Sequence, residues 1–359
     1  MKYIIVTQTY PPRIGGMQNV MASISERLAS IEDTHVFPDH FLSKKNNFSN
    51  SQLQIHNNFS PKLLRPFIKK YLIDKVYKDN DVVICDSWKS INAVPPNIKK
   101  IFVLAHGQEF LLTNKKFGLI KKSLDRASCI ICSSNYTENL ITKFKVTDTK
   151  KIVIPPTYSI EIPPKSRTKF KKKSKLVSLL TISRLEERKG IIPVLKSLSE
   201  LNKNKFLKPF FWNICGEGPQ KNEIKKCIKS FGLSEQVKLI GKISGHAKVD
   251  FIQNCDLFVM PSYKVKNSIE GFGISYIEAA AYGIPSIAGI DGGVLDAVTD
   301  SMTGWCVNPL SLNELSDTIM EAINNEKKRK EYGQKAKRQF MDYFSGEKVF
   351  RKLVDTISI

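Results

Sequence analysis

Short apolar runs alternate with helical patterns along the first part of the chain. The runs predict strands at residues 3–9, 82–85, 101–105, 129–132 and 152–154. Directly after the first run, Met17, Val20, Ile24 and Leu28 recur at the spacing of one helix face. Strands that alternate with amphipathic helices are typical of βαβ units in a parallel sheet, so we expect a doubly wound α/β domain here.

The second part of the chain repeats this plan. Further apolar runs predict strands at residues 176–182, 210–215, 237–240, 257–260 and 286–288. A proline- and lysine-rich stretch at 162–173 separates the two parts and has the composition of a surface linker. We therefore expect a first domain at 1–165, a second at 166–340, and a final helical segment at 341–359 that packs back on the first domain. Two such sheets that face each other would form a cleft at the carboxyl ends of their strands.

Composition narrows the class of protein. The chain of 359 residues is 42% hydrophobic and 25% charged, and because it has no long uncharged apolar run we expect no membrane-spanning segment. The seven cysteines are scattered and several lie within apolar runs, which favours reduced thiols in the cytoplasm. The net charge of +22 is the one feature of the composition that is far from ordinary. It indicates nucleic acid, anionic lipid or a phosphorylated substrate as a partner.

Two glycine loops follow predicted strands. Gly15 and Gly16 lie between the first strand and its helix, where backbone amides at the positive end of a helix favour phosphate. Gly216 lies in the run Cys215-Gly216-Glu217-Gly218-Pro219, again between a strand and a helix. A tight turn explains either loop nearly as well, so neither predicts a ligand by itself.

Charged residues mark the loops of the second part. Arg184 and Lys189 follow its first strand, where a guanidinium fork and an ammonium could together neutralise a diphosphate; a solvated turn is the alternative. Glu270 lies in a glycine loop, and Glu278 lies among Ile277 and alanines on a predicted helix. Because carboxylates are seldom buried without a partner, hydroxyl groups of a sugar or ribose are suitable donors to both; a solvated helix glutamate is the alternative for Glu278.

The order of these motifs carries a resemblance to a known family. Gly-Gly follows the first strand, Ser-Arg-Leu-x-x-x-Lys-Gly follows at 183–190, Gly-Glu-Gly-Pro at 216–219, and Glu-Gly-Phe-Gly at 270–273, with Glu278 eight residues after Glu270. The chain resembles the retaining glycosyltransferases of family 4, which have the GT-B fold of two Rossmann-like domains that face each other across a cleft. The opening at 10–18 is most similar to the branch of bacterial phosphatidylinositol mannosyltransferases.

The resemblance implies a role for each candidate residue. The equivalents of Arg184 and Lys189 bind the donor diphosphate and stabilise the departing nucleotide. The equivalent of Glu270 contacts the transferred sugar, and that of Glu278 holds the ribose hydroxyls. His106 lies where the family places a histidine near the reacting sugar, although a structural histidine is the alternative. The other donor-binding residues implied are Gly15, Gly16, Gly216, Gly271, Phe272 and Gly273.

The implied reaction moves a hexose from a UDP- or GDP-sugar, with retention, to a glycan or lipid-linked acceptor in the synthesis of cell-surface polysaccharide, lipopolysaccharide or glycolipid. The donor is a substrate, and neither a cofactor nor a metal is expected. Asp79-Asn80-Asp81 spells the DxD of metal-dependent transferases, but it precedes its strand and we interpret it as a turn. A nucleotide-sugar epimerase and a basic nucleic-acid-binding protein are the alternatives.

Basic and apolar residues interleave at 61–78. With the lysine pairs 115–116 and 121–122 and with Arg126, they predict a basic face on the first domain. Anionic lipid would attract such a face by about 1 kcal/mol per cation near the surface. We therefore expect a cytoplasmic enzyme bound peripherally to the inner face of the cytoplasmic membrane; an ordinary solvated helix is the alternative.

Overall fold

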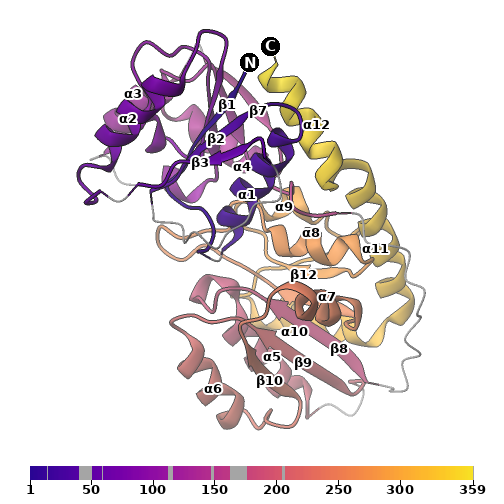
Figure 1. Cartoon of the computed structure of the whole chain (residues 1–359). Coiled ribbons are helices and arrows are strands. Elements are labelled where there is room, and N and C mark those ends of the chain that lie inside the picture. Colours follow the sequence, from indigo (N-terminus) through magenta and orange to yellow (C-terminus); the bar gives the residue numbers. More distant parts are fainter. Residues whose placement is uncertain are drawn as a thin grey trace. The chain divides into compact units, whose positions relative to one another are not determined.

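The computed structural model describes residues 1–13, 15–39, 51–58, 60–111, 116–146, 149–161, 176–203 and 207–358. The chain divides into two compact units, Met1–Glu161 with Gly346–Ile359, and Ile162–Ser345 (Figure 1). The predicted linker at 162–173 and Lys115 lie outside the described residues. No helix in the described ranges combines the length and the apolarity that crossing a membrane requires.

The first unit is built on a parallel sheet. Its described strands are β1 (Tyr3–Val6), β2 (Thr34–Phe37), β3 (Leu53–Ile55), β4 (Val82–Cys85), β5 (Ile101–Ala105), β6 (Cys129–Cys132) and β7 (Lys150–Val153). Their order across the sheet is β3-β2-β1-β4-β5-β6-β7. Its described α-helices are α1 (Gly16–Ala29), α2 (Arg65–Val76), α3 (Phe117–Leu124), α4 (Asn135–Thr142) and α12 (Gly346–Ile357). The strand order reverses between β1 and β4, and such a reversal is where open parallel sheets bind ligands.

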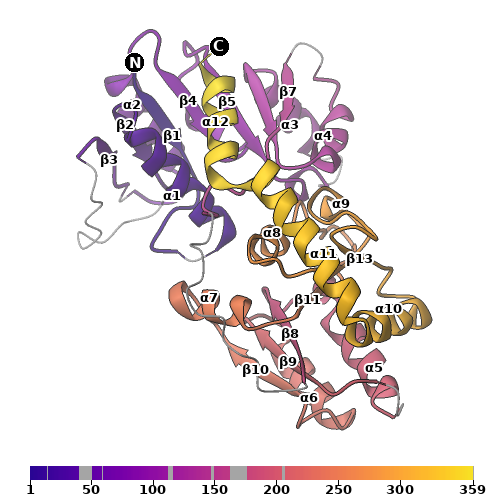
Figure 2. The same ribbon diagram turned by 90° about the vertical axis from the view of Figure 1, so that its right-hand side faces the viewer.

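Helix α12 joins the first unit although it ends the chain. The Gly346 amide donates to the carbonyl of Ile160 at 2.8 Å, and Nζ of Lys352 donates to the carbonyl of Val153 at 2.9 Å. Figures 1 and 2 show this helix, in yellow, alongside the strands of the first sheet.

The second unit repeats the architecture. Its described strands are β8 (Val177–Ile182), β9 (Phe210–Cys215), β10 (Val237–Gly241), β11 (Leu257–Met260), β12 (Ser286–Ala288) and β13 (Gly304–Cys306). Their order is β10-β9-β8-β11-β12-β13, with every pair parallel. Its α-helices are α5 (Ile191–Leu201), α6 (Lys221–Ser230), α7 (Gly245–Gln253), α8 (Ile274–Ala281), α9 (Val294–Ala297), α10 (Leu312–Asn324) and α11 (Glu326–Gln339). The strand order reverses between β8 and β11, which directs attention to the loops after these two strands.

Candidate functional site

The loops at the carboxyl edge of the second sheet are bonded to one another. The amide of Tyr263, after β11, donates to the carbonyl of Arg188, after β8, at 2.9 Å. Gly216, after β9, has a φ of 146°, and a Cβ there would lie 1.8 Å from the carbonyl oxygen of Ser183. Only glycine permits this approach, so packing alone accounts for Gly216.

The carboxylate of Glu270 lies between two cations of the loop after β8. Its Oε2 atom accepts from Nη1 of Arg188 at 2.7 Å and forms an ion pair with Nζ of Lys189. Burial by itself raises the pKa of the Glu270 carboxyl, but Lys189 and Arg188 together outweigh burial and leave that pKa below its ordinary value. Burial lowers the pKa of the Lys189 ammonium, against the opposing effect of Glu270. The structure therefore holds Glu270 as a charged acceptor.

Arg184 is exposed and joins this cluster indirectly. Its side chain is 75% exposed, and its Nη2 lies 3.1 Å from Oε1 of Glu186. Oε2 of the same Glu186 lies 3.1 Å from Nε of Arg188. Among Arg184, Arg188 and Lys189, Arg184 is thus the most accessible to solvent and to an anion in solution.

The loop before α8 is fixed by close packing. Gly273 caps the helix at a φ of 97°, and a Cβ there would lie 2.4 Å from the ring of Tyr276. The side chain of Phe272 is buried and meets Phe344 edge to face, with ring centroids 5.8 Å apart. The N-terminal end of α8, which favours an anion, begins at Ile274, and the loop from Gly271 to Gly273 joins it to Glu270.

Glu278 has a partner within the protein. It lies on α8 and forms an ion pair with Nζ of Lys248 on α7, with side chains that are 21% and 27% exposed. The expectation that this carboxylate needs a donor is met by a lysine. Nothing in the sequence singles out Lys248, whereas Arg188 directly precedes the candidate Lys189 in the same charged loop.

In the first unit, His106 follows β5 and is held at two points. Its ring Nε2 lies 2.9 Å from the carbonyl oxygen of Asp86, and its amide donates to Oε1 of Glu109 at 2.8 Å. Gly16 is the first residue of α1, with Gly15 before it in an extended conformation. A small cavity beside His106 is lined by Val20, Leu104, Ala105, Ile131, Ser133, Ile154, Pro156 and Tyr158.

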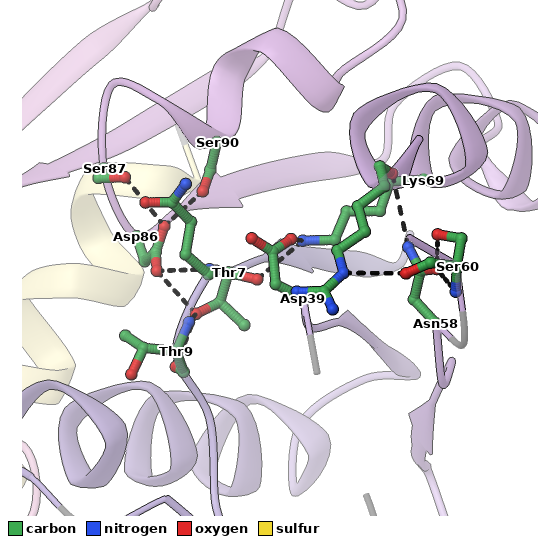
Figure 3. Close-up of polar contacts among 11 residues, drawn as sticks. Thr7, Thr9, Asp39, Asn58, Ser60, Lys69, Asp86, Ser87 and Ser90 are labelled. Atoms are coloured by element: carbon green, nitrogen blue, oxygen red, sulfur yellow. Dashed lines mark hydrogen bonds and ion pairs between the residues drawn. The ribbon is translucent and has the colours of Figure 1, made fainter. Parts of the chain in front are cut away.

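Asp86 is a buried hub at the reversal point of the first sheet (Figure 3). One carboxylate oxygen accepts from the Thr7 hydroxyl at 2.8 Å and from the Gln8 amide at 2.7 Å. The other accepts from the hydroxyls of Ser87 and Ser90. These bonds tie the end of β1 to the end of β4.

Lys69 lies beside this hub and is not part of the predicted basic face. Its ammonium is buried, forms an ion pair with Asp39, and donates to the carbonyl of Thr7 at 2.8 Å (Figure 3). The DxD-like run is a turn, as predicted, and Asp81 accepts from the amides of Lys2 at 2.7 Å and Lys78 at 2.9 Å.

Comparison with known sequences finds similarity to glycosyltransferases. Residues 164–339 match the family model of glycosyl transferases group 1. An uncharacterized glycosyltransferase of Methanocaldococcus jannaschii is 25% identical over 99% of this chain and 98% of its own length. A 2-deoxystreptamine N-acetyl-D-glucosaminyltransferase of Niallia circulans is also 25% identical, over 79% of this chain and 69% of its own. A GDP-mannose-dependent α-(1-6)-phosphatidylinositol monomannoside mannosyltransferase of Mycobacterium tuberculosis is 27% identical over 45% of this chain and 42% of its own.

Comparison with solved structures identifies the fold. The Anabaena protein HepE, whose crystal structure holds UDP-glucose, is similar with a TM-score of 0.80 at 17% sequence identity, over 100% of this chain and 99% of that chain. The predicted GT-B fold is confirmed, and the relatives do not favour an epimerase.

Proposed function

We propose that this glycosyltransferase moves a hexose from a nucleotide sugar to a hydroxyl group of a glycan or lipid-linked acceptor, with retention at the anomeric carbon. The second unit binds the donor and the first unit binds the acceptor. The observation that carries the proposal is the cluster that Arg188 and Lys189, after β8, form with Glu270, after β11, within the region that matches group 1. The M. tuberculosis relative, named for a lipid-linked acceptor, supports the acceptor class.

The charges of the site residues suit them to different parts of the donor. Arg184 and Lys189 neutralise the diphosphate, since a departing nucleoside diphosphate gains negative charge as its bond to the sugar breaks. Glu270, kept charged by its two cations, accepts hydrogen bonds from sugar hydroxyls. Glu278 accepts hydrogen bonds from the ribose hydroxyls after its ion pair with Lys248 opens.

The reaction needs one proton transfer. The acceptor oxygen bonds to the anomeric carbon while the bond from that carbon to the phosphate oxygen breaks, and the acceptor hydroxyl gives its proton to the departing phosphate oxygen. No protein base is required in this scheme, and catalysis depends on placement and on charge stabilisation. The donor is consumed as a substrate, and we propose that neither a cofactor nor a metal takes part.

Product analysis tests the reaction. The protein is incubated with UDP-glucose, UDP-N-acetylglucosamine or GDP-mannose and a bacterial lipid extract, with and without EDTA. We expect one nucleoside diphosphate to be released for each acceptor glycosylated, in equal yield with EDTA, and an NMR anomeric configuration equal to that of the donor. Donor converted to an isomer without release of nucleotide would instead support an epimerase. Salt-sensitive binding of arbitrary DNA without affinity for any nucleotide would support the nucleic-acid alternative.

We also propose that α2 docks the first unit on an anionic membrane at the inner face of the cytoplasmic membrane. Leu63, Phe67 and Tyr71 are 86%, 71% and 59% exposed, which is unusual for large apolar side chains in one short stretch. Phe67 and Tyr71 lie on α2 with the exposed Lys70 and Lys75, and Leu63 lies just before the helix. Apolar residues that enter the interface and cations that meet anionic headgroups are the chemistry of an interfacial helix.

Liposome flotation tests the membrane proposal. The double variant Phe67→Ser/Tyr71→Ser should bind vesicles of mixed anionic and neutral lipid several-fold less than the wild type. The matched control is Tyr343→Ser in the second unit, whose side chain is 69% exposed and which should bind normally. Equal flotation with purely neutral and with anionic vesicles at low salt would contradict the proposal.

A further inference from the structure

We infer that Arg188 is a positioning residue for Glu270: it keeps the carboxylate in place when the donor diphosphate draws the ammonium of Lys189 away. The inference rests on the proposed function. It concerns a residue at an unspecified position of the motif at 183–190, directly before Lys189.

Arg188 is anchored on three sides. Its Nε lies 3.1 Å from Oε2 of Glu186, its Nη1 lies 2.7 Å from Oε2 of Glu270, and its carbonyl accepts from the Tyr263 amide at 2.9 Å. The side chain is only 13% exposed. A planar guanidinium held by two carboxylates and by its own backbone has little freedom to leave.

Lys189 shares the same carboxylate oxygen but is held differently. Its Nζ also meets Oε2 of Glu270, through a point charge on a flexible stem. A diphosphate that arrives beside the loop offers a larger negative charge than one carboxylate. If Lys189 turns to it, Arg188 still binds Oε2, so Glu270 keeps its orientation and its other oxygen for a sugar hydroxyl.

The charged groups around Glu270 determine the pH at which its carboxylate protonates and activity falls. Arg188 and Lys189 face it from the loop after β8, Glu186 lies behind Arg188, and the Tyr276 phenol lies on the adjoining helix α8. Without Arg188, burial would be opposed by Lys189 alone, so the pKa of the Glu270 carboxyl would rise. The carboxylate would then protonate, and activity would fall, at a higher pH than in the wild type.

Steady-state kinetics over a pH series test this inference with Arg188→Met, Arg188→Lys and Lys335→Met. Lys335 belongs to an exposed ion pair on α11 and serves as the charge-matched control. For Arg188→Met we expect kcat to fall on the order of 10–100-fold, a donor KM within about threefold of wild type, and an acid limb at higher pH. Arg188→Lys should recover part of kcat, and Lys335→Met should match wild type.

Two results would overturn the inference. A raised donor KM at unchanged kcat would mean that Arg188 binds the diphosphate itself, and an unchanged acid limb would mean that it does not act through Glu270. Glu186→Gln, which loosens Arg188 without touching Glu270, should shift kcat in the same direction by a smaller factor, and its failure to do so would count against the anchoring role even if Arg188→Met does not fold. Absence of transfer by the wild type with every donor would instead refute the proposed function.

Discussion

The Nε2 atom of His106 lies 2.9 Å from the backbone carbonyl oxygen of Asp86. A carbonyl oxygen only accepts, so Nε2 carries the hydrogen, and in the neutral ring Nδ1 is the acceptor. The Asp86 carboxylate, bound by the Thr7 and Ser90 hydroxyls and the Gln8 amide, keeps this carbonyl in place. We therefore propose that Nδ1 of His106 accepts a hydrogen bond from a substrate hydroxyl.

Replacing His106 should impair turnover and spare nucleotide binding. We expect His106→Ala to lower kcat about 100-fold, because a positioned acceptor is lost. The affinity for UDP or GDP, measured by calorimetry, should stay within twofold because the proposed diphosphate and ribose contacts of Arg184, Lys189 and Glu278 belong to the second unit. Full turnover by His106→Ala would show that this histidine is structural.

Glu278 should set the preference for ribose. We expect the wild type to bind a nucleoside diphosphate about tenfold more tightly than its 2′-deoxy form, because a carboxylate placed for a hydroxyl is left unpaired without it. Glu278→Gln should lower this ratio of affinities toward one. Glu314 is an exposed glutamate of α10, and the control variant Glu314→Gln should keep the ratio of the wild type. An equal ratio in wild type and Glu278→Gln would remove Glu278 from the ribose site.

A half-buried histidine pair should make the first unit sensitive to acid. Nδ1 of His35 lies 2.8 Å from Nε2 of His56, and the Phe37 ring stacks on His56 at 4.3 Å between centroids. Burial, helped by the charge of His35, lowers the pKa of His56 from 6.5 to about 4. Between pH 6.5 and about pH 4, His56 therefore binds a proton in the unfolded chain but not in the folded chain. The free energy of unfolding falls as the pH is lowered through this range.

The size of that loss is measurable. Allowing for solvent screening at a partly exposed pair, we expect roughly 1–2 kcal/mol between pH 7.5 and pH 5. Urea unfolding at the two pH values gives the difference, and His56→Gln should show a smaller one. An equal loss in both proteins would place the acid sensitivity elsewhere.

Short, wholly apolar runs made much of the fold predictable. Val82–Cys85 is buried on both faces of a parallel sheet, so every position is apolar and the strand is visible in the sequence. Strand β2, which contains Thr34 and His35, and strand β13, which is only Gly304–Cys306, give no such run. Both become strands through the neighbours that the fold provides.

The sequence predicts that the carboxylates of the candidate site need hydrogen-bond donors, but it does not predict which residues supply them. Glu270 and Glu278, in apolar or glycine-rich surroundings, indicated that each carboxylate required a donor. The donors, Arg188 and Lys248, come from other loops and helices, and only the topology of the second sheet brings them near. Exposure could not be read from the sequence either, since Arg184 and Lys189 share a loop but only Lys189 is buried.

Calorimetric titration of UDP, GDP and ADP into the wild type and into Arg184→Met tests the central claim most directly. Arg184 is exposed, so its loss should leave the fold intact. We predict that at least one of these nucleotides binds the wild type with one site, and that Arg184→Met binds it about 10–100-fold more weakly, as expected for a lost charge-assisted bond to phosphate. Binding of none of the three, or equal affinity in both proteins, would contradict a diphosphate site at this loop.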